Sequence, residues 1–203
     1  MSEALNQSAL AGRSAPDSLA VALREMTGRG MIDLRGMAGD SALMAAAAEV
    51  LGVALPTTPR TAVSWGEVKV FWLSTDQWLV LCPLIKLAET LAALEAALIG
   101  RHCLVADVSD MRSVIRVEGD AARLVLLKGT SLDLLSPDYG PGTVRRMLFA
   151  GTGALINIVS DNPDVIDIYV LRSYAVYAWD WLIANAGKSA LPATFGMQPA
   201  PSV

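Results

Sequence analysis

The chain has 203 residues, enough for one large domain or two small ones around a substantial core. Its formal net charge is -4 and its pI is near 5.0, so it has no basic footprint for phosphate backbones and nucleic acid is not an expected partner. Hydrophobic residues make up 53% of the chain and the mean hydropathy is +0.44, which indicates apolar surface that a partner protein would cover.

The N-terminal half predicts a tail followed by an α+β unit. Residues 1–18 are rich in serine, alanine and polar side chains, and we expect them to form a flexible tail. Asp40 and Ser41 are both suited to cap an alanine-rich helix that Gly52 closes. Alternation and periodicity predict, in chain order, strands 21–26 and 31–35, a helix 41–51, strands 67–73 and 77–81, and a helix 84–99.

The C-terminal half predicts the same kinds of element. A polar turn at residues 109–112 separates its first two strands, and Gly129 closes the helix that follows them. Prolines in residues 188–203 predict an extended C-terminal tail. The expected elements are strands 103–108 and 113–117, a helix 121–128, strands 154–159 and 165–171, and a helix 173–186.

The two halves repeat one order of elements. Residues 32–36 and 115–119, which lie 83 residues apart, both run from a strand through an aspartate into a helix. The repeated order of strand, helix, two strands and helix predicts an α+β fold of two similar halves, with antiparallel sheets, helices on one face and a pseudo-twofold axis. We expect a single domain of residues 19–187, made of pseudo-repeats at about 19–100 and 101–187.

Neither a membrane span nor an export signal is predicted. Charged residues interrupt the apolar stretches at 84–99 and around Asp180, so neither reaches the roughly 18 to 20 uninterrupted apolar residues of a spanning helix. The N-terminal segment has no basic start followed by an apolar block. Cys82 and Cys103 lie in apolar runs and do not indicate a disulfide framework, so we expect a reducing, cytoplasmic location.

Residues suited to catalysis or metal binding are few. His102 precedes Cys103, but neighbouring residues of a strand point to opposite faces, so a structural role is favoured over a Cys/His nucleophile pair. Two cysteines and one histidine cannot supply the four ligands of a closed zinc site. The glycine-containing segments 140–142 and 151–153 fit no phosphate-binding motif and predict turns. We therefore predict no catalytic, cofactor-binding or metal-binding residue in this chain.

Carboxylates and tryptophans are the next candidates. Asp107 with Asp110, and Asp133 with Asp138, lie in turn contexts where aspartates are normally solvated, so paired acid–base catalysis is the weaker interpretation. Tryptophan suits either a core or an interface, and core positions are expected for the three tryptophans before residue 100. The two in the last helix are two positions apart, so at least one is expected to leave the core.

Loops at strand and helix ends hold the densest polar chemistry and are the expected contact sites. Arg112 and Arg172 are suited to bidentate carboxylate contacts, either within the chain or with a partner or an anionic ligand. The predicted partner-interface residues are Arg112, Tyr139, Arg172, Tyr174, Trp179 and Trp181.

Four segments form an ordered set of motifs within residues 20–186. They are residues 76–81 (DQWLVL), 107–120 (DVSDMR leading into VIRVEGD), 126–133 (LLKGTSLD) and 172–181 (RSYAVYAWDW). Together they resemble the gamma subunit of heterotetrameric sarcosine oxidase. The Lys-Gly-Thr-Ser-Leu-Asp and Arg-Ser-Tyr elements, in that order, are the more specific ones.

The resemblance implies a fold like the folate-binding aminomethyltransferase domain of the glycine cleavage system. It also implies a structural and assembly subunit without catalytic residues of its own. The implied complex oxidatively demethylates sarcosine to glycine, with the one-carbon unit passed to tetrahydrofolate or released as formaldehyde. Its alpha, beta and delta subunits would be the partners, and FAD, FMN, NAD, tetrahydrofolate and zinc would reside in those subunits.

Two alternatives stay open. A gamma-type subunit of N-methylglutamate dehydrogenase would share the same motifs. A stand-alone folate-binding aminomethyltransferase-like protein would need an acidic group deep in a folate channel, and a further C-terminal domain for which we expect no room after Ala186.

Overall fold

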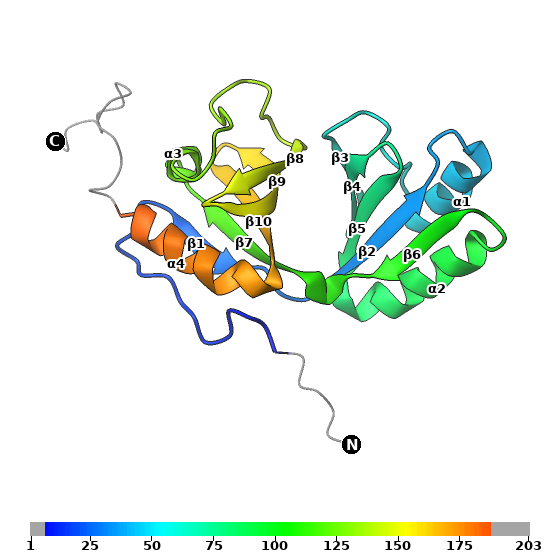
Figure 1. Ribbon diagram of the computed structural model, residues 1–203, viewed down its shortest axis with the longest axis horizontal. Helices are drawn as coiled ribbons and strands as arrows, with labels where there is room; N and C mark the ends of the chain where they lie inside the picture. Colours follow the sequence, from blue (N-terminus) through cyan, green and yellow to red (C-terminus); the bar gives the residue numbers. More distant parts are fainter. Residues whose placement is uncertain (1–6, 188–203) are drawn as a thin grey trace, which may run out of the picture.

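The computed structural model describes residues 7–187. Within this range, ten strands form two five-stranded antiparallel sheets that lie side by side, and four α-helices cover the outer faces (Figure 1). The predicted α+β fold of two similar halves is therefore confirmed. No helix in residues 7–187 is long and apolar enough to cross a membrane.

The first sheet has the strand order β3-β4-β5-β2-β6 and carries helices α1 and α2. Asp40 caps α1, because its Oδ1 accepts hydrogen bonds from the backbone N–H groups of Ala42 (3.1 Å) and Leu43 (2.9 Å). Gly52 ends the helix with φ 69°, a left-handed conformation that favours glycine. The elements are β2 Arg29–Gly36, α1 Ser41–Leu51, β3 Ala62–Trp65, β4 Val68–Ser74, β5 Gln77–Pro83, α2 Leu87–Ala97 and β6 Cys103–Asp107.

The second sheet has the order β1-β7-β10-β9-β8 and carries helices α3 and α4. Ala150 and Gly151 both have positive φ, which is the backbone of the tight turn that joins β8 to β9. The elements are β1 Ala22–Glu25, β7 Arg112–Glu118, α3 Ala122–Leu127, β8 Val144–Phe149, β9 Thr152–Asp161, β10 Asp164–Leu171 and α4 Ala175–Asn185.

The two halves exchange their first strands. Leu23 of β1 pairs with Val117 of β7 in the second sheet, and Val105 of β6 pairs with Leu34 of β2 in the first. The two sequence repeats meet near residue 100. Each sheet nevertheless contains one strand from the other repeat, β6 in the first sheet and β1 in the second. The exchange holds the halves together through backbone hydrogen bonds as well as side-chain packing.

Three hydrophobic cores stabilise this arrangement. One lies between α1, α2 and the first sheet, and a second between α3, α4 and the second sheet. The third lies between the inner faces of the two sheets, where the Phe71 and Tyr169 rings meet edge to face at 5.5 Å. The members of the third core are Met31, Phe71, Leu73, Leu79, Leu81, Val114, Val144, Leu155 and Tyr169.

Strands β3 and β8 were absent from the sequence-based prediction. Each forms an edge of its sheet, where polar and charged side chains interrupt the alternation that identifies a strand. The two edges meet, because Ala62 donates its backbone N–H to the Gly142 carbonyl and Val144 donates to the Arg60 carbonyl, both at 2.8 Å. Trp65, expected in the core, lies on β3 and is 70% exposed, which corrects that prediction.

The N-terminal segment 7–18 packs on the second half and differs from the flexible tail expected. Leu10 is 2% exposed in the core beneath α4, and Arg13 forms an ion pair with Asp180 of that helix. The Ala20 N–H donates to the Ala186 carbonyl at 2.8 Å. The remaining predicted tail residues, 1–6 and 188–203, lie outside the described residues.

Candidate functional site

A row of polar side chains crosses the inner face of the second sheet. Strand pairing places Arg116 on β7 opposite Asp167 on β10, and Asp167 opposite Asn157 on β9. Paired residues of adjacent strands share a face, so these side chains point together toward the first sheet. Asp167 is 0% exposed, and Asn157 Nδ2 is buried without a hydrogen-bond partner.

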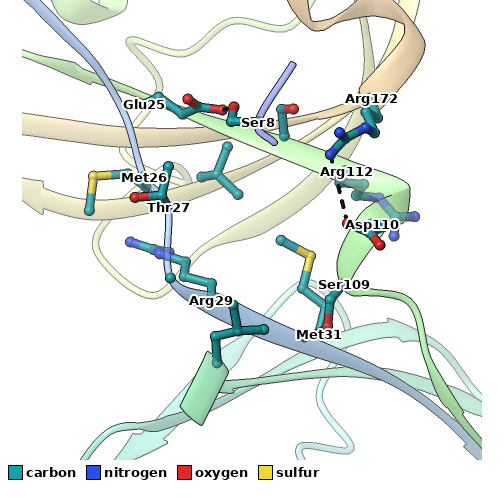
Figure 2. A pocket seen from close by; sticks show the side chains of 14 residues that line it. Ser8, Glu25, Met26, Thr27, Arg29, Met31, Ser109, Asp110, Arg112 and Arg172 are labelled. Atoms are coloured by element: carbon teal, nitrogen blue, oxygen red, sulfur yellow. Dashed lines mark hydrogen bonds and ion pairs between the residues drawn. The ribbon is translucent and has the colours of Figure 1, made fainter. Parts of the chain in front are cut away.

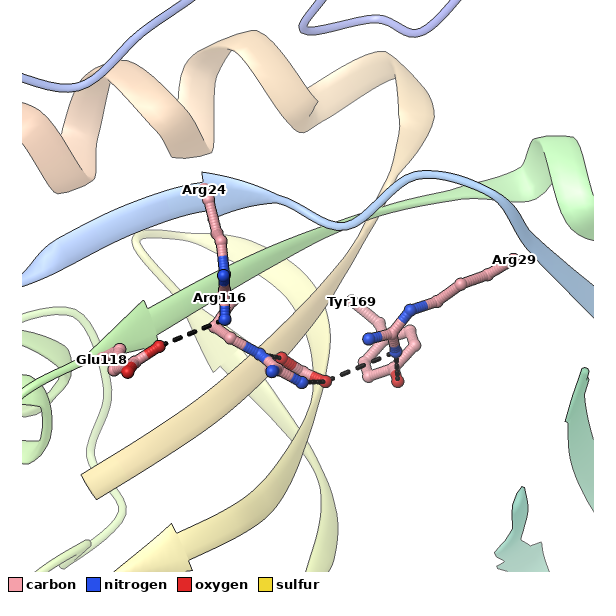
Figure 3. Close-up of polar contacts among 6 residues, drawn as sticks. Arg24, Arg29, Arg116, Glu118 and Tyr169 are labelled. Atoms are coloured by element: carbon pink, nitrogen blue, oxygen red, sulfur yellow. Dashed lines mark hydrogen bonds and ion pairs between the residues drawn. The ribbon is translucent and has the colours of Figure 1, made fainter. Parts of the chain in front are cut away.

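Asp167 is the centre of a junction cluster, which comprises Arg29, Arg116, Asp167 and Tyr169 (Figure 3). Arg116 binds the carboxylate through two nitrogens, with Nε 2.6 Å from Oδ1 and Nη2 2.9 Å from Oδ2. Arg29 comes from β2 of the other sheet, and its Nη1 lies 3.4 Å from Asp167 Oδ2 and 3.1 Å from the Tyr169 hydroxyl. A single carboxylate thus connects the two halves.

The electrostatics of the junction cluster favour fixed charges over proton transfer. The hydrogen bond from Arg116 to Asp167 raises the pKa of that guanidinium. Burial, together with the Asp167 charge, raises the pKa of the Tyr169 hydroxyl far above its ordinary value, so this group stays protonated at neutral pH. Burial lowers the pKa of nearby Lys69 on β4. The raised pKa values of Arg116 and Tyr169 keep both groups protonated, as suits a structural junction.

A junction cavity of about 260 Å³ opens between the two halves where β1 leads into β2 (Figure 2). Two predicted interface residues line it, Arg112 and Arg172. Arg172 lies 3.7 Å from the Asp110 carboxylate and donates to the Gln7 carbonyl. The Arg172 guanidinium therefore binds groups of the same chain. This is one of the two predicted alternatives, the other being a contact with a partner or an anionic ligand.

A second cavity, of about 250 Å³, lies on the inner face of the second sheet and is lined by Arg112 and Arg146. Burial lowers the pKa of Arg112, and the positive charge of Arg146 lowers it further. We call this space the arginine cavity.

The other predicted interface residues divide between surface and core. Tyr174 is 45% exposed, between β10 and α4, and is available to a partner. Trp179 is 2% exposed and packs in the core of the second half. This position corrects the prediction that its side chain contacts a partner. Trp181 is half-buried against Phe149, with ring centroids 4.9 Å apart. Tyr139 is also buried, with the Arg145 guanidinium over its ring.

The Cys/His pair and the aspartate pairs occupy structural positions. The Cys103 thiol lies 3.8 Å from the Leu98 carbonyl at the end of α2 and has no hydrogen bond to His102. Asp107 accepts from the backbone and hydroxyl of Ser109, which is a turn contact. No group of three or more metal-ligating side chains occurs within residues 7–187.

The junction cluster and Arg146 were missed at the sequence level. A usable signal exists for Asp167, since a carboxylate inside the apolar strand Val165–Val170 must find a buried partner. No local pattern identifies Arg29 as that partner, because it lies 138 residues away.

Three curated relatives bear the name sarcosine oxidase subunit gamma. The protein from an Arthrobacter species is 35% identical over 95% of this chain and 89% of its own length. The one from Corynebacterium strain P-1 is 35% identical over 69% of this chain, and the match spans 64% of that relative's length. The one from Corynebacterium strain U-96 is 34% identical, over 68% of this chain and 64% of its own.

Two solved structures share the fold. A chain of heterotetrameric sarcosine oxidase from Corynebacterium sp. U-96 matches with a TM-score of 0.82 and 26% identity, over 93% of this chain and 98% of that one. Aminomethyltransferase T of the glycine cleavage system from Bartonella henselae matches with a TM-score of 0.60 and 15% identity, over 91% of this chain and 49% of that one. The second match confirms the aminomethyltransferase-like fold.

Residues 35–188 match the family described as sarcosine oxidase, gamma subunit. The segment includes all four motifs noted in the sequence and most of both sheets. The chain therefore belongs to the sarcosine oxidase gamma subunit family.

Proposed function

We propose that this chain is the gamma subunit of a heterotetrameric, flavin-dependent complex that oxidatively demethylates sarcosine, and that its own role is assembly rather than catalysis. The observation that carries the proposal is the match to a chain of heterotetrameric sarcosine oxidase over 98% of that chain. The similarity extends across both sheets and the helices that cover them, so it supports a complete subunit fold rather than a shared motif.

The surface supports a partner-bound subunit. Large apolar side chains stand in the solvent on both halves, including Ile85, which is 92% exposed at the start of the α2 region, and Leu148 on β8. Tyr174 and Tyr177 add exposed aromatic surface at the start of α4. Exposed aromatic and aliphatic side chains of this kind are the usual anchors of protein interfaces.

The junction cluster supports a non-catalytic role. The Asp167 carboxylate is bound by two guanidinium groups and the Tyr169 hydroxyl is held protonated, so both groups are engaged in contacts within the chain. The chemistry of the complex would then reside in the alpha, beta and delta partners, together with FAD, FMN, NAD, tetrahydrofolate and zinc. The two free cysteines are consistent with a cytoplasmic complex.

The proposal is tested by co-expressing the tagged chain with the products of adjacent genes. We expect flavin-bearing subunits to co-purify in a single species that oxidises sarcosine. Omission of this chain should release the partners as smaller species. Oxidation of N-methylglutamate instead would identify the related dehydrogenase, and a fully active complex of unchanged mass without this chain would contradict the assembly role.

The non-catalytic part is tested separately with Tyr169→Phe in the assembled complex. This variant removes only the hydroxyl at the junction cluster. We expect kcat for sarcosine to stay within about twofold, since a group that makes no transition-state contact contributes little to the barrier. A loss of about 100-fold with assembly intact would assign catalysis to this chain.

A further inference from the structure

The arginine cavity brings two positive side chains over an apolar floor. Strand pairing places Arg146 opposite Leu155 and Leu155 opposite Tyr169, so these three share the inner face of the second sheet. Arg112, at the start of β7, pairs with Leu171 of β10. The floor consists of apolar and aromatic side chains, and no Asp or Glu lines the cavity.

Neither arginine forms an ion pair within residues 7–187, and the one carboxylate whose charge acts on Arg112, that of Asp33 on β2, does not line the cavity. The hydrogen bond given by Arg112 runs from Nη1 to the sulfur of Met111 at 3.8 Å, a weak acceptor. Arg146 donates from Nη2 to the neutral Gln77 side-chain oxygen at 2.9 Å. By contrast, Arg29 and Arg116, on the same inner side of the fold, are both paired with a carboxylate.

This arrangement carries an unfavourable free energy that a bound anion would reverse. Burial disfavours the charged form of Arg112 and the Arg146 charge adds repulsion; these two effects lower the pKa of Arg112, and the charge of Asp33 only partly opposes them. A negative group between the two guanidiniums would replace repulsion with two attractions and restore hydrogen bonds to the desolvated nitrogens.

We propose that the arginine cavity is a binding site for a small organic carboxylate, with its carboxylate between Arg112 and Arg146 and its apolar body against Leu171, which is 38% exposed. Guanidinium groups match the planar carboxylate, and the apolar floor selects a hydrocarbon or aromatic body over an inorganic anion. The volume of about 250 Å³ suits a molecule of a single ring. The site does not depend on the assembly role proposed above.

The test uses 4-fluorobenzoate as the probe and fluorine NMR as the readout, on the full chain alone and in its complex. Arg146→Gln is the primary variant because its side chain is exposed, so the fold should tolerate the change. Arg145→Gln is the matched control, since it removes the same charge from the adjacent position of β8 but on the opposite face. We expect Arg146→Gln and Arg112→Gln each to weaken binding by about tenfold and Arg145→Gln to leave it within about twofold.

Three outcomes would overturn the proposal. Equal weakening by Arg145→Gln would show attraction to general positive charge rather than to this site. If inorganic phosphate competed for the site as well as acetate or 4-fluorobenzoate does, the apolar floor would make no contribution to binding. If 4-fluorobenzoate bound to the free chain but not to the complex, the two arginines would instead bind a carboxylate of a partner subunit.

Discussion

Asp167 shows how a single buried charge can organise a fold. It sits on the central strand of its sheet at 0% exposure, where an unpaired carboxylate would be prohibitively destabilising. Arg116 compensates it from the neighbouring strand and Arg29 from the opposite half. Removing one partner of such a cluster lowers the free energy of unfolding by more than the net contribution of the intact cluster, because the remaining charges stay buried.

Asp167→Ala is therefore expected to lower the free energy of unfolding by about 3–5 kcal/mol, because it leaves Arg116 and Arg29 without their carboxylate. Urea denaturation of the full chain measures the loss. Asp138→Ala is the control, since Asp138 is exposed in a loop and should change stability by no more than about 0.5 kcal/mol. Equal effects of the two variants would show that the junction cluster does not stabilise the fold.

Asp40 makes the cap of α1 sensitive to pH. The backbone N–H of Leu43 is the main cause that holds the pKa of this carboxyl below its ordinary value, and Arg101 also contributes. A depressed folded-state pKa means that the stabilisation is complete above the unfolded-state pKa of about 3.8 and is lost as pH falls through the folded-state value.

Asp40→Asn keeps a capping oxygen but cannot titrate, because an amide replaces the carboxyl. We expect the stability difference between wild type and variant to be constant from pH 7 to about pH 5 and to shrink in more acidic buffer. Thermal unfolding by circular dichroism at each pH measures it. A difference that does not change with pH would exclude Asp40 titration as the cause.

Among the elements, α3 depends on a close approach at its C-terminal end. Gly129 follows the helix, and its carbonyl accepts the backbone N–H of Ala150 from the β8–β9 turn at 2.8 Å. A Cβ atom at Gly129 would lie 2.8 Å from the Phe149 ring and 2.9 Å from the Trp181 ring. The Phe149 and Trp181 rings occupy the space that a side chain at Gly129 would need. Helix α3, the β8–β9 hairpin and α4 therefore pack together at Gly129.

Gly129→Ala is expected to destabilise the chain by about 1–3 kcal/mol, since rigid rings must move to admit the methyl group. Gly39→Ala is the matched control, because nothing lies within 4 Å of a Cβ at that position. Differential scanning calorimetry should show a lower Tm only for Gly129→Ala. An unchanged Tm in both variants would mean that Phe149 and Trp181 adjust freely.

At the scale of the whole molecule, strand exchange makes the halves interdependent. The first sheet takes β6 from beyond residue 100, and the second takes β1 from before it. The inner faces also share the core around Phe71 and Tyr169. A fragment that ends at residue 100 therefore lacks an edge strand and exposes an apolar face.

Fragments 1–100 and 101–203 are expected to be largely unfolded when expressed alone and to form a stable complex when co-expressed. The reason is that each contains a strand that completes the other's sheet. Affinity capture of one tagged fragment, followed by circular dichroism of the product, tests this. Two fragments that fold independently as monomers would contradict the interdependence.

The fold class, the repeated order of elements and the cap of α1 follow from the sequence alone. They depend on local features, namely alternation, helical periodicity and the residues at Asp40 and Gly52. The edge strands β3 and β8 escaped prediction because polar side chains at a sheet edge weaken the same local signal. The motifs that indicate the family were also readable before the structure, and the family match confirms them.

Only the tertiary structure decided which strands share a sheet and which charges meet. Arg29 reaches Asp167 across 138 residues. Arg112 and Arg146 line one cavity although their strands, β7 and β8, are separated in the sheet by β10 and β9. Likewise, Trp179 is buried because α4 turns it toward the second sheet rather than toward a partner. The physical reason is that local sequence sets the conformation of each segment, whereas long-range packing and the burial of charge select how the segments combine.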